Sequence, residues 1–222
     1  MSRVLAIGDL HAPFVHPRYL RHCVDISNKY KCNKVVFMGD EADNHAISYH
    51  EKNPDGHSPG SELAQAKRVL AHWFRAFPVA SVCISNHGSL FYRKGVTAGL
   101  PAAVFRSYAE IWGAPATWRW ELSHEVDGVQ YIHGTGFSGQ NGAINAAKKH
   151  RQSTVIGHIH SHGGVQWSAT QRDIIFGLNA GCGIDLKSYA FEYGREFPER
   201  PTLGCGVVLD GKKAFFEPLK ME

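Results

Sequence analysis

Five short polar blocks, each directly after a run of apolar residues, constrain the fold of this chain more than any other feature. They are Gly8-Asp9-Leu10-His11, Gly39-Asp40-Glu41-Ala42-Asp43, Asn86-His87, His133-Gly134 and Gly157-His158-Ile159-His160. Short apolar runs rich in β-branched residues are typical of buried strands. We therefore expect five strand ends to bring Asp, His and Asn side chains to one edge of a sheet.

The spacing inside two blocks indicates metal binding. Asp9 and His11 follow the predicted strand Arg3–Ile7 at positions i and i+2, so they can converge on one ion if the extended conformation persists. His158 and His160 repeat this spacing after another apolar run. Imidazole, carboxylate and amide ligands together suit Mn, Fe, Zn or Ni, and they are too rich in nitrogen for a dedicated Ca or Mg site. The pattern predicts two divalent ions.

The order of the blocks resembles the calcineurin-like metallophosphoesterase superfamily, with a likeness to its small bacterial and phage members. The resemblance runs from residue 8 to residue 160 and so covers most of the chain. It implies two metal ions bridged by Asp40. One ion would be held by Asp9, His11 and His160, and the other by Asn86, His133 and His158.

The same resemblance implies an enzyme that hydrolyses a phosphomonoester or phosphodiester by attack of a metal-bound hydroxide, with Mn²⁺ as the expected ion. His87 matches the histidine that protonates the leaving oxygen, and Asp43 matches the acid that orients it. Expected substrates are a phosphorylated small molecule, a nucleotide, a nucleic acid or a phosphoprotein. The alternative is a metal-binding scaffold of the same fold that has lost turnover and acts as an interaction module. Candidate substrate contacts are His45, Arg93 and His162.

Two departures from the family pattern stand out. The usual Gly-Asn-His-Asp/Glu block is Ser85-Asn86-His87-Gly88 here, so the small first residue becomes polar and the trailing acid is missing. Asn44-His45 follows the second block, where eukaryotic-type serine/threonine phosphatases carry an Arg. The second departure argues against a protein phosphatase of that type.

Length and composition predict a single domain over residues 1–222, which the resemblance implies is a metallophosphoesterase domain. A 43% hydrophobic share with 20% charged residues is ordinary for a globular enzyme, and the formal charge of +4 is compatible with an anionic substrate. The five cysteines are widely spaced and lack a Cys-x-x-Cys pair, which favours a reduced, cytoplasmic protein. Cys182 lies in a glycine-rich turn, where we expect a small buried residue rather than a nucleophile. No leader and no membrane span are expected.

Predicted strands and helices alternate in the first half of the chain, which favours parallel strands with helical crossovers. The strands are expected at Arg3–Ile7, Lys34–Met38 and Val79–Ile84, and the helices at Arg18–Tyr30 and Glu62–Phe77. The aromatic segment Phe105–Trp120 could cap the site, but core packing under a long connection is the stronger interpretation.

The second half is richer in hairpin signals and has one clear helix, Asn141–Arg151. The predicted strand pairs are Trp118–Glu125 with Val129–His133, Gly163–Ser168 with Asp173–Gly177, and Cys205–Leu209 with Lys213–Phe216. Both halves together predict an α/β fold: a four-layer α/β/β/α sandwich of two mixed sheets, with a dinuclear metal site at the strand ends.

Overall fold

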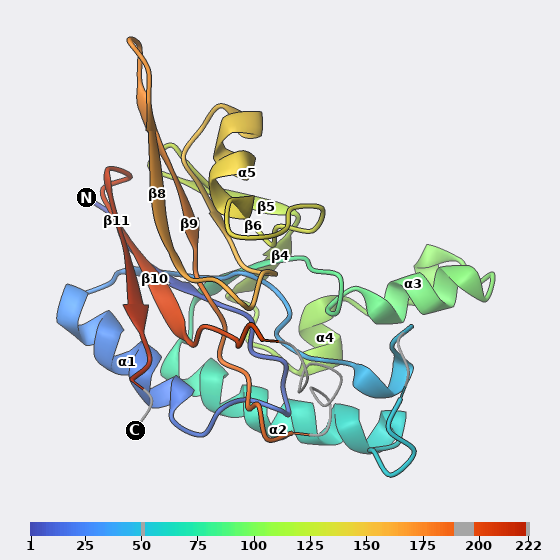
Figure 1. The fold of residues 1–222 in the computed structure, drawn as a ribbon. Coiled ribbons are helices and arrows are strands. Elements are labelled where there is room, and N and C mark those ends of the chain that lie inside the picture. Colours follow the sequence, from blue (N-terminus) through green and yellow to red (C-terminus); the bar gives the residue numbers. More distant parts are fainter. Residues whose placement is uncertain (50–51, 189–197, 221–222) are drawn as a thin grey trace.

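The computed structural model describes residues 1–49, 52–188 and 198–220, and in them the chain forms two mixed sheets (Figure 1). The first sheet has the strand order β11-β10-β1-β2-β3-β4. Its strands are β1 (Arg3–Ile7), β2 (Lys34–Phe37), β3 (Ala80–Cys83), β4 (Trp118–Glu121), β10 (Gly204–Leu209) and β11 (Lys213–Pro218). The strands β1 to β4 are parallel, while β10 and β11 are antiparallel to their neighbours.

The second sheet has the strand order β5-β6-β7-β9-β8. Its strands are β5 (Ser123–Val126), β6 (Val129–Ile132), β7 (Thr154–Ile156), β8 (Gly164–Ala169) and β9 (Ile174–Asn179). β6, β7 and β9 are parallel, and the two outer strands pair antiparallel with their hairpin partners.

The described ranges hold five α-helices, and three of them cover the outer faces of the two sheets. The five are α1 (Tyr19–Tyr30), α2 (Pro59–Ala76), α3 (Leu90–Thr97), α4 (Tyr108–Trp112) and α5 (Gly142–His150), with short 3₁₀ turns at His45–Ile47 and Ala102–Val104. In Figure 1, α1 and α2 lie along the first sheet, and α5 lies on the opposite side against the second. None of the helices in the described ranges is long and apolar enough to cross a bilayer.

The period-two alternation of β1 explains the layers. Leu5 and Ile7 belong to the core shared with α1 and α2, whereas Val4 and Ala6 belong to the core between the two sheets. A third, smaller core lies between α5 and the second sheet. The predicted four-layer α/β/β/α sandwich is therefore confirmed.

Most predicted boundaries hold within a few residues. The helix predicted from Glu62 begins at Pro59, because the Ser58 hydroxyl accepts a hydrogen bond from the amide of Ser61 and Pro59 suits the first helical position. Sequence analysis missed α3 altogether, and it missed α4, which begins with a capping box formed by Ser107 and Glu110.

The predicted strand Trp118–Glu125 is wrong as a single element. The chain leaves the first sheet after Glu121 and enters the second at Ser123, with Leu122 exposed between them. Only β5 forms the predicted hairpin with β6, around Asp127-Gly128, where both residues have positive φ. The other two predicted hairpins are confirmed.

Tryptophans of the aromatic segment Phe105–Trp120 pack into the core, as predicted. Trp112 and Trp118 are buried in the cluster formed with α2 and the first sheet. The cysteines also follow prediction: all five are free, and Cys182 is fully buried.

Candidate metal centre

The five polar blocks meet at the carboxyl ends of five strands. β1, β2 and β3 run parallel in the first sheet, and β6 and β7 run parallel in the second, so the segments after these strands lie at one end of each sheet. The structure brings the predicted ligands from both sheets into contact there. Sequence spacing alone does not show that contact.

One group of four side chains comes from both sheets. Its members are Asp9, His11, Asp40 and His160, whose ligand atoms all lie within 4.8 Å of one another. His160 Nε2 lies 3.1 Å from Asp9 Oδ2 and 3.1 Å from His11 Nε2. His11 Nε2 also lies 3.5 Å from Asp40 Oδ2.

A second group shares Asp40 with the first. It contains Asp40, His133 and His158, again within 4.8 Å of one another. His133 Nε2 lies 3.4 Å from Asp40 Oδ2, 2.7 Å from Asn86 Oδ1 and 3.2 Å from His158 Nδ1. Because the same Asp40 oxygen faces both groups, it occupies the position expected of a bridging ligand.

The donor set fits divalent cations. Oδ1 of buried Asp9 has no hydrogen-bond partner in the described ranges, and ring nitrogens face one another at 3.1 to 3.2 Å between His11 and His160 and between His133 and His158. Facing nitrogen and oxygen lone pairs repel one another when too few hydrogens lie between them, and a bound cation removes this repulsion. These clusters can therefore hold metal ions.

Burial keeps the pKa of His11 below its ordinary value, which favours the neutral imidazole that binds metals. Burial would raise the pKa of Asp40, but the nearby imidazoles, led by those of His133 and His87, outweigh it and hold this pKa well below its usual range. The Asp40 carboxyl is therefore ionised at neutral pH.

Tight turns, rather than extended strands, orient the predicted ligands. The sequence predicts that Asp9 and His11 lie in one extended segment. In the structure His11 has a left-handed φ of 51°, and the amides of Leu10 and His11 both donate to the carbonyl of Asp40. His158 likewise has φ of 65°. The expected convergence thus occurs by a different route, because the left-handed residues turn the chain into the site.

Gly39 shows how closely these turns approach one another. Its φ is 101°, and a Cβ there would lie 2.6 Å from Ser85 Cβ and 2.8 Å from His133 Nδ1. Only glycine fits at this position, next to the bridging ligand.

His87 lies beside the first group, but Asp43 does not support it in the expected way. Its Nδ1 lies 2.6 Å from the backbone carbonyl of Asp43 and 3.6 Å from Asp43 Oδ1. The Asp43 carboxylate lies 2.5 Å from Nδ1 of His11 instead. The Asp43 side chain therefore orients a predicted metal ligand, and the Asp43 main chain orients the predicted general acid.

Electrostatics keep the His87 imidazole easy to protonate. Burial lowers the pKa of His87, but the charges of Asp40 and Asp43 outweigh this effect and raise the pKa above its ordinary value. The amide of His87 also donates to Asp40 Oδ1 at 3.0 Å, which ties the His87 loop to the bridging residue.

Two of the three predicted substrate contacts lie beside this centre. His45 Nδ1 is 3.8 Å from Asp43 Oδ2, and Arg93 donates from Nη1 to the carbonyl of Asn86 at 3.2 Å. His162 instead lines a cavity of about 220 Å³, whose lining includes no residue of either group.

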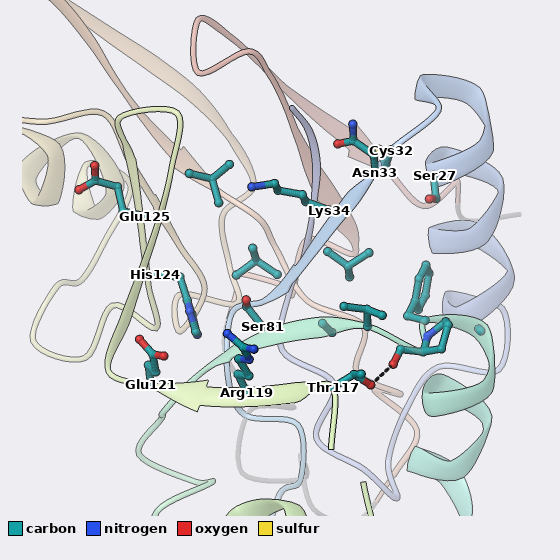
Figure 2. Close-up of a pocket in the computed structure, with 18 of the residues that line it drawn as sticks. Ser27, Cys32, Asn33, Lys34, Ser81, Thr117, Arg119, Glu121, His124 and Glu125 are labelled. Carbon is teal, nitrogen blue, oxygen red and sulfur yellow. Dashed lines mark hydrogen bonds between the residues drawn. The ribbon is translucent and has the colours of Figure 1, made fainter. Parts of the chain in front are cut away.

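A cavity of about 970 Å³ lies elsewhere (Figure 2). Its lining includes Lys34 and Ser81, near the starts of β2 and β3, and Arg119 and His124 from β4 and β5. Parallel strands place their amino ends away from their carboxyl ends. This cavity is therefore distinct from the site that the predicted ligands form.

Sequence reasoning missed Ser85 as a functional residue. Its hydroxyl accepts hydrogen bonds from the amides of Asp40, at 2.8 Å, and Gly88, at 3.0 Å. The departure from the family pattern at this position therefore joins the turn of the bridging ligand to the loop of Asn86 and His87.

Comparisons with known proteins add little to this geometry. No family model and no curated protein matches the chain. Among solved structures, Vacuolar Protein Sorting 29 from Cryptosporidium parvum aligns with a TM-score of 0.47 and 12% identity, over 99% of this chain and 98% of that one. Vps29 from Chaetomium thermophilum gives 0.43 and 12%, over 99% and 97%. A single mutant of Vps29 from Entamoeba histolytica gives 0.42 and 12%, over 98% and 99%.

Proposed function

We propose that this protein is a metal-dependent phosphoesterase of the calcineurin-like type that resembles its small bacterial and phage members. One observation carries the proposal: Asp40 Oδ2 lies 3.5 Å from Nε2 of His11 and 3.4 Å from Nε2 of His133, so one carboxylate joins two ligand groups. Two divalent ions bound there would orient a phosphoryl group, activate water and offset charge in an in-line displacement.

The chain itself supplies the proton. His87 Nδ1 donates its hydrogen to the carbonyl of Asp43, which leaves Nε2 as the atom available to a substrate. In the imidazolium form, Nε2 would donate a proton to the leaving oxygen as the ester bond breaks. The His87 side chain is 22% exposed, so a substrate at the mouth of the site can reach it.

Positively charged groups favour an anionic substrate. Arg93 donates from one guanidinium nitrogen to the carbonyl of Asn86 and stacks over the Tyr49 ring, and its remaining N–H groups would contact a phosphate oxygen. His45 lies on the other side of Asp43 and could contact the same phosphate. Both remain proposed substrate contacts.

An interaction module that binds metal without turnover is the second candidate. The solved structures that align with this chain are named for vacuolar protein sorting, although identities of 12% and TM-scores below 0.5 do not separate the two candidates. Both would hold metal through the same side chains. Turnover is therefore the property that distinguishes them.

A substrate panel tests the proposal. The full chain, stripped with chelator and reloaded with Mn²⁺, would be assayed with a chromogenic monoester, a chromogenic diester, nucleotides, cyclic nucleotides, phosphopeptides and single-stranded DNA. We expect metal-dependent release from at least one ester, lost on addition of chelator and restored by Mn²⁺. Two bound ions with no release from any ester would favour the interaction module.

A further inference from the structure

A buried acidic side chain beside the bridging ligand has no role in the mechanism above. Glu41 is 1% exposed, and its Oε1 accepts hydrogen bonds from the indole N–H groups of Trp112 and Trp120, both at 3.0 Å. Its second oxygen, Oε2, has no hydrogen-bond partner in the described part of the chain. A buried, half-satisfied carboxyl is costly and calls for a compensating role.

The unpartnered oxygen faces the loop that carries Asn86 and His87. A Cβ built at Gly88 would lie 3.1 Å from Oε2 and 3.3 Å from Oε1 of Glu41. The same Cβ would lie 2.8 Å from Ser85 Oγ, closer than real Cβ atoms approach other groups. The Glu41 carboxyl and the Ser85 hydroxyl thus fill the space that a side chain at position 88 would need.

The two indoles extend this contact to the aromatic segment. Trp112 ends α4 and Trp120 lies in β4, and both donate to the residue that follows Asp40 directly. Glu41 therefore lies where three parts of the molecule meet: the turn of Asp40, the indoles of Trp112 and Trp120, and the Asn86-His87 loop.

We propose that Glu41 is a positioning residue whose carboxyl takes the place of an acidic side chain at position 88 and holds the Asn86-His87 loop against the turn of Asp40. Gly88 leaves room for the Glu41 carboxyl, and the Ser85 hydroxyl fills the rest of that space. This inference rests on the proposed metal centre, because the loop it positions carries the predicted ligand Asn86.

The first test compares Glu41→Leu with Glu41→Gln in the full chain, by calorimetric titration of the chelator-stripped protein with Mn²⁺. Glutamine keeps an oxygen acceptor for both indoles, whereas leucine removes it. We expect leucine to weaken one of the two Mn²⁺ binding steps by 10- to 100-fold, the usual effect of losing a group that orients a ligand, and glutamine to restore most of that affinity. A merely structural role would lower the melting temperature and weaken both steps alike.

The second test exchanges the carboxyl between positions. Ser85→Gly/Gly88→Asp removes the blocking hydroxyl and rebuilds an acidic side chain at position 88, within about 3 Å of the Glu41 carboxyl. Two facing carboxylates repel each other, so we expect this double variant to bind Mn²⁺ at least tenfold more weakly than wild type. Adding Glu41→Gln should recover that loss, because the amide can donate to the new carboxylate.

Each arm can overturn the inference. If Glu41→Leu binds both Mn²⁺ ions with wild-type affinity, Glu41 positions nothing. If Glu41→Gln fails to improve the double variant, positions 41 and 88 do not share one carboxyl. If wild type itself binds no Mn²⁺, the proposed metal centre fails separately. Near-ultraviolet circular dichroism of the indoles then decides the anchoring role, which an unchanged spectrum in Glu41→Leu would contradict.

Discussion

Replacing Asp43 by asparagine tests which imidazole its carboxylate supports, His87 as the sequence pattern predicts or His11 as the structure has it. The Asp43 carboxylate lies 2.5 Å from Nδ1 of His11, and both side chains are almost fully buried, whereas His87 is held by the Asp43 backbone carbonyl. A carboxylate on the far nitrogen of a ligating imidazole fixes its orientation and raises its basicity. We therefore expect Asp43→Asn to weaken metal binding, and the loss of its charge to lower the pKa of His87 while the main-chain hydrogen bond to that ring stays in place.

The size of the effect follows from this contact. Losing such a carboxylate typically costs 10- to 100-fold in metal affinity, or about 1.4 to 2.8 kcal/mol. The main-chain bond to His87 survives, so at saturating Mn²⁺, and at a pH low enough to keep His87 protonated in both proteins, the dependence of rate on the leaving group should match that of wild type. Asp25→Asn, on the exposed ion pair of α1 with Arg21, is the matched control and should leave both quantities unchanged.

Two measurements on the same protein check this prediction: calorimetric titration with Mn²⁺, and hydrolysis rates for esters with good and poor leaving groups. Unchanged Mn²⁺ affinity in Asp43→Asn, with slower turnover confined to poor leaving groups, would refute the reasoning. It would place the Asp43 carboxylate on His87, as the sequence pattern predicts.

Three further predictions follow from single contacts. His87→Ala should retain both metal ions yet slow turnover by about 10²- to 10⁴-fold, most for poor leaving groups, as checked by elemental analysis and steady-state kinetics. Burial raises the pKa of Glu217, but its contacts with Lys29 and a neighbouring tyrosine outweigh burial and lower this pKa, so the ionised side chain stabilises the fold at neutral pH and loses that effect on acidification. Urea unfolding should therefore show Glu217→Gln to be about 0.5 kcal/mol less stable than wild type at pH 7. The difference should close once the pH falls through the lowered pKa of Glu217. Gly183→Ala would place a Cβ 1.8 Å from the ring of Tyr19, so thermal melting should show a loss of more than about 2 kcal/mol; wild-type stability would contradict that packing.

The predicted ligands could be found from the sequence because their chemistry is local. Asp, His and Asn after an apolar run imply a strand end, and parallel strands bring such ends together. The turns that orient these side chains were not predictable, since nothing in the sequence indicates a left-handed conformation at His11 or Asp40.

Contacts between residues distant in sequence account for most of what the pattern missed. Glu41 is an ordinary acid in the sequence, and its role emerges only where indoles from residues 112 and 120 reach it. The break at Leu122 was hidden because residues 118–125 read as one alternating strand, although the two halves join different sheets. Asp43 shows a further limit, since spacing cannot tell a carboxylate contact from a carbonyl contact of the same residue.

The rate of phosphoester hydrolysis as Mn²⁺ is added back to chelator-stripped protein tests the central claim most directly. Parallel elemental analysis would give the number of ions bound per chain. The account predicts no hydrolysis without metal and a rate that rises as two ions bind. Two ions bound with no hydrolysis of any ester in the panel, or hydrolysis that persists without metal, would contradict it.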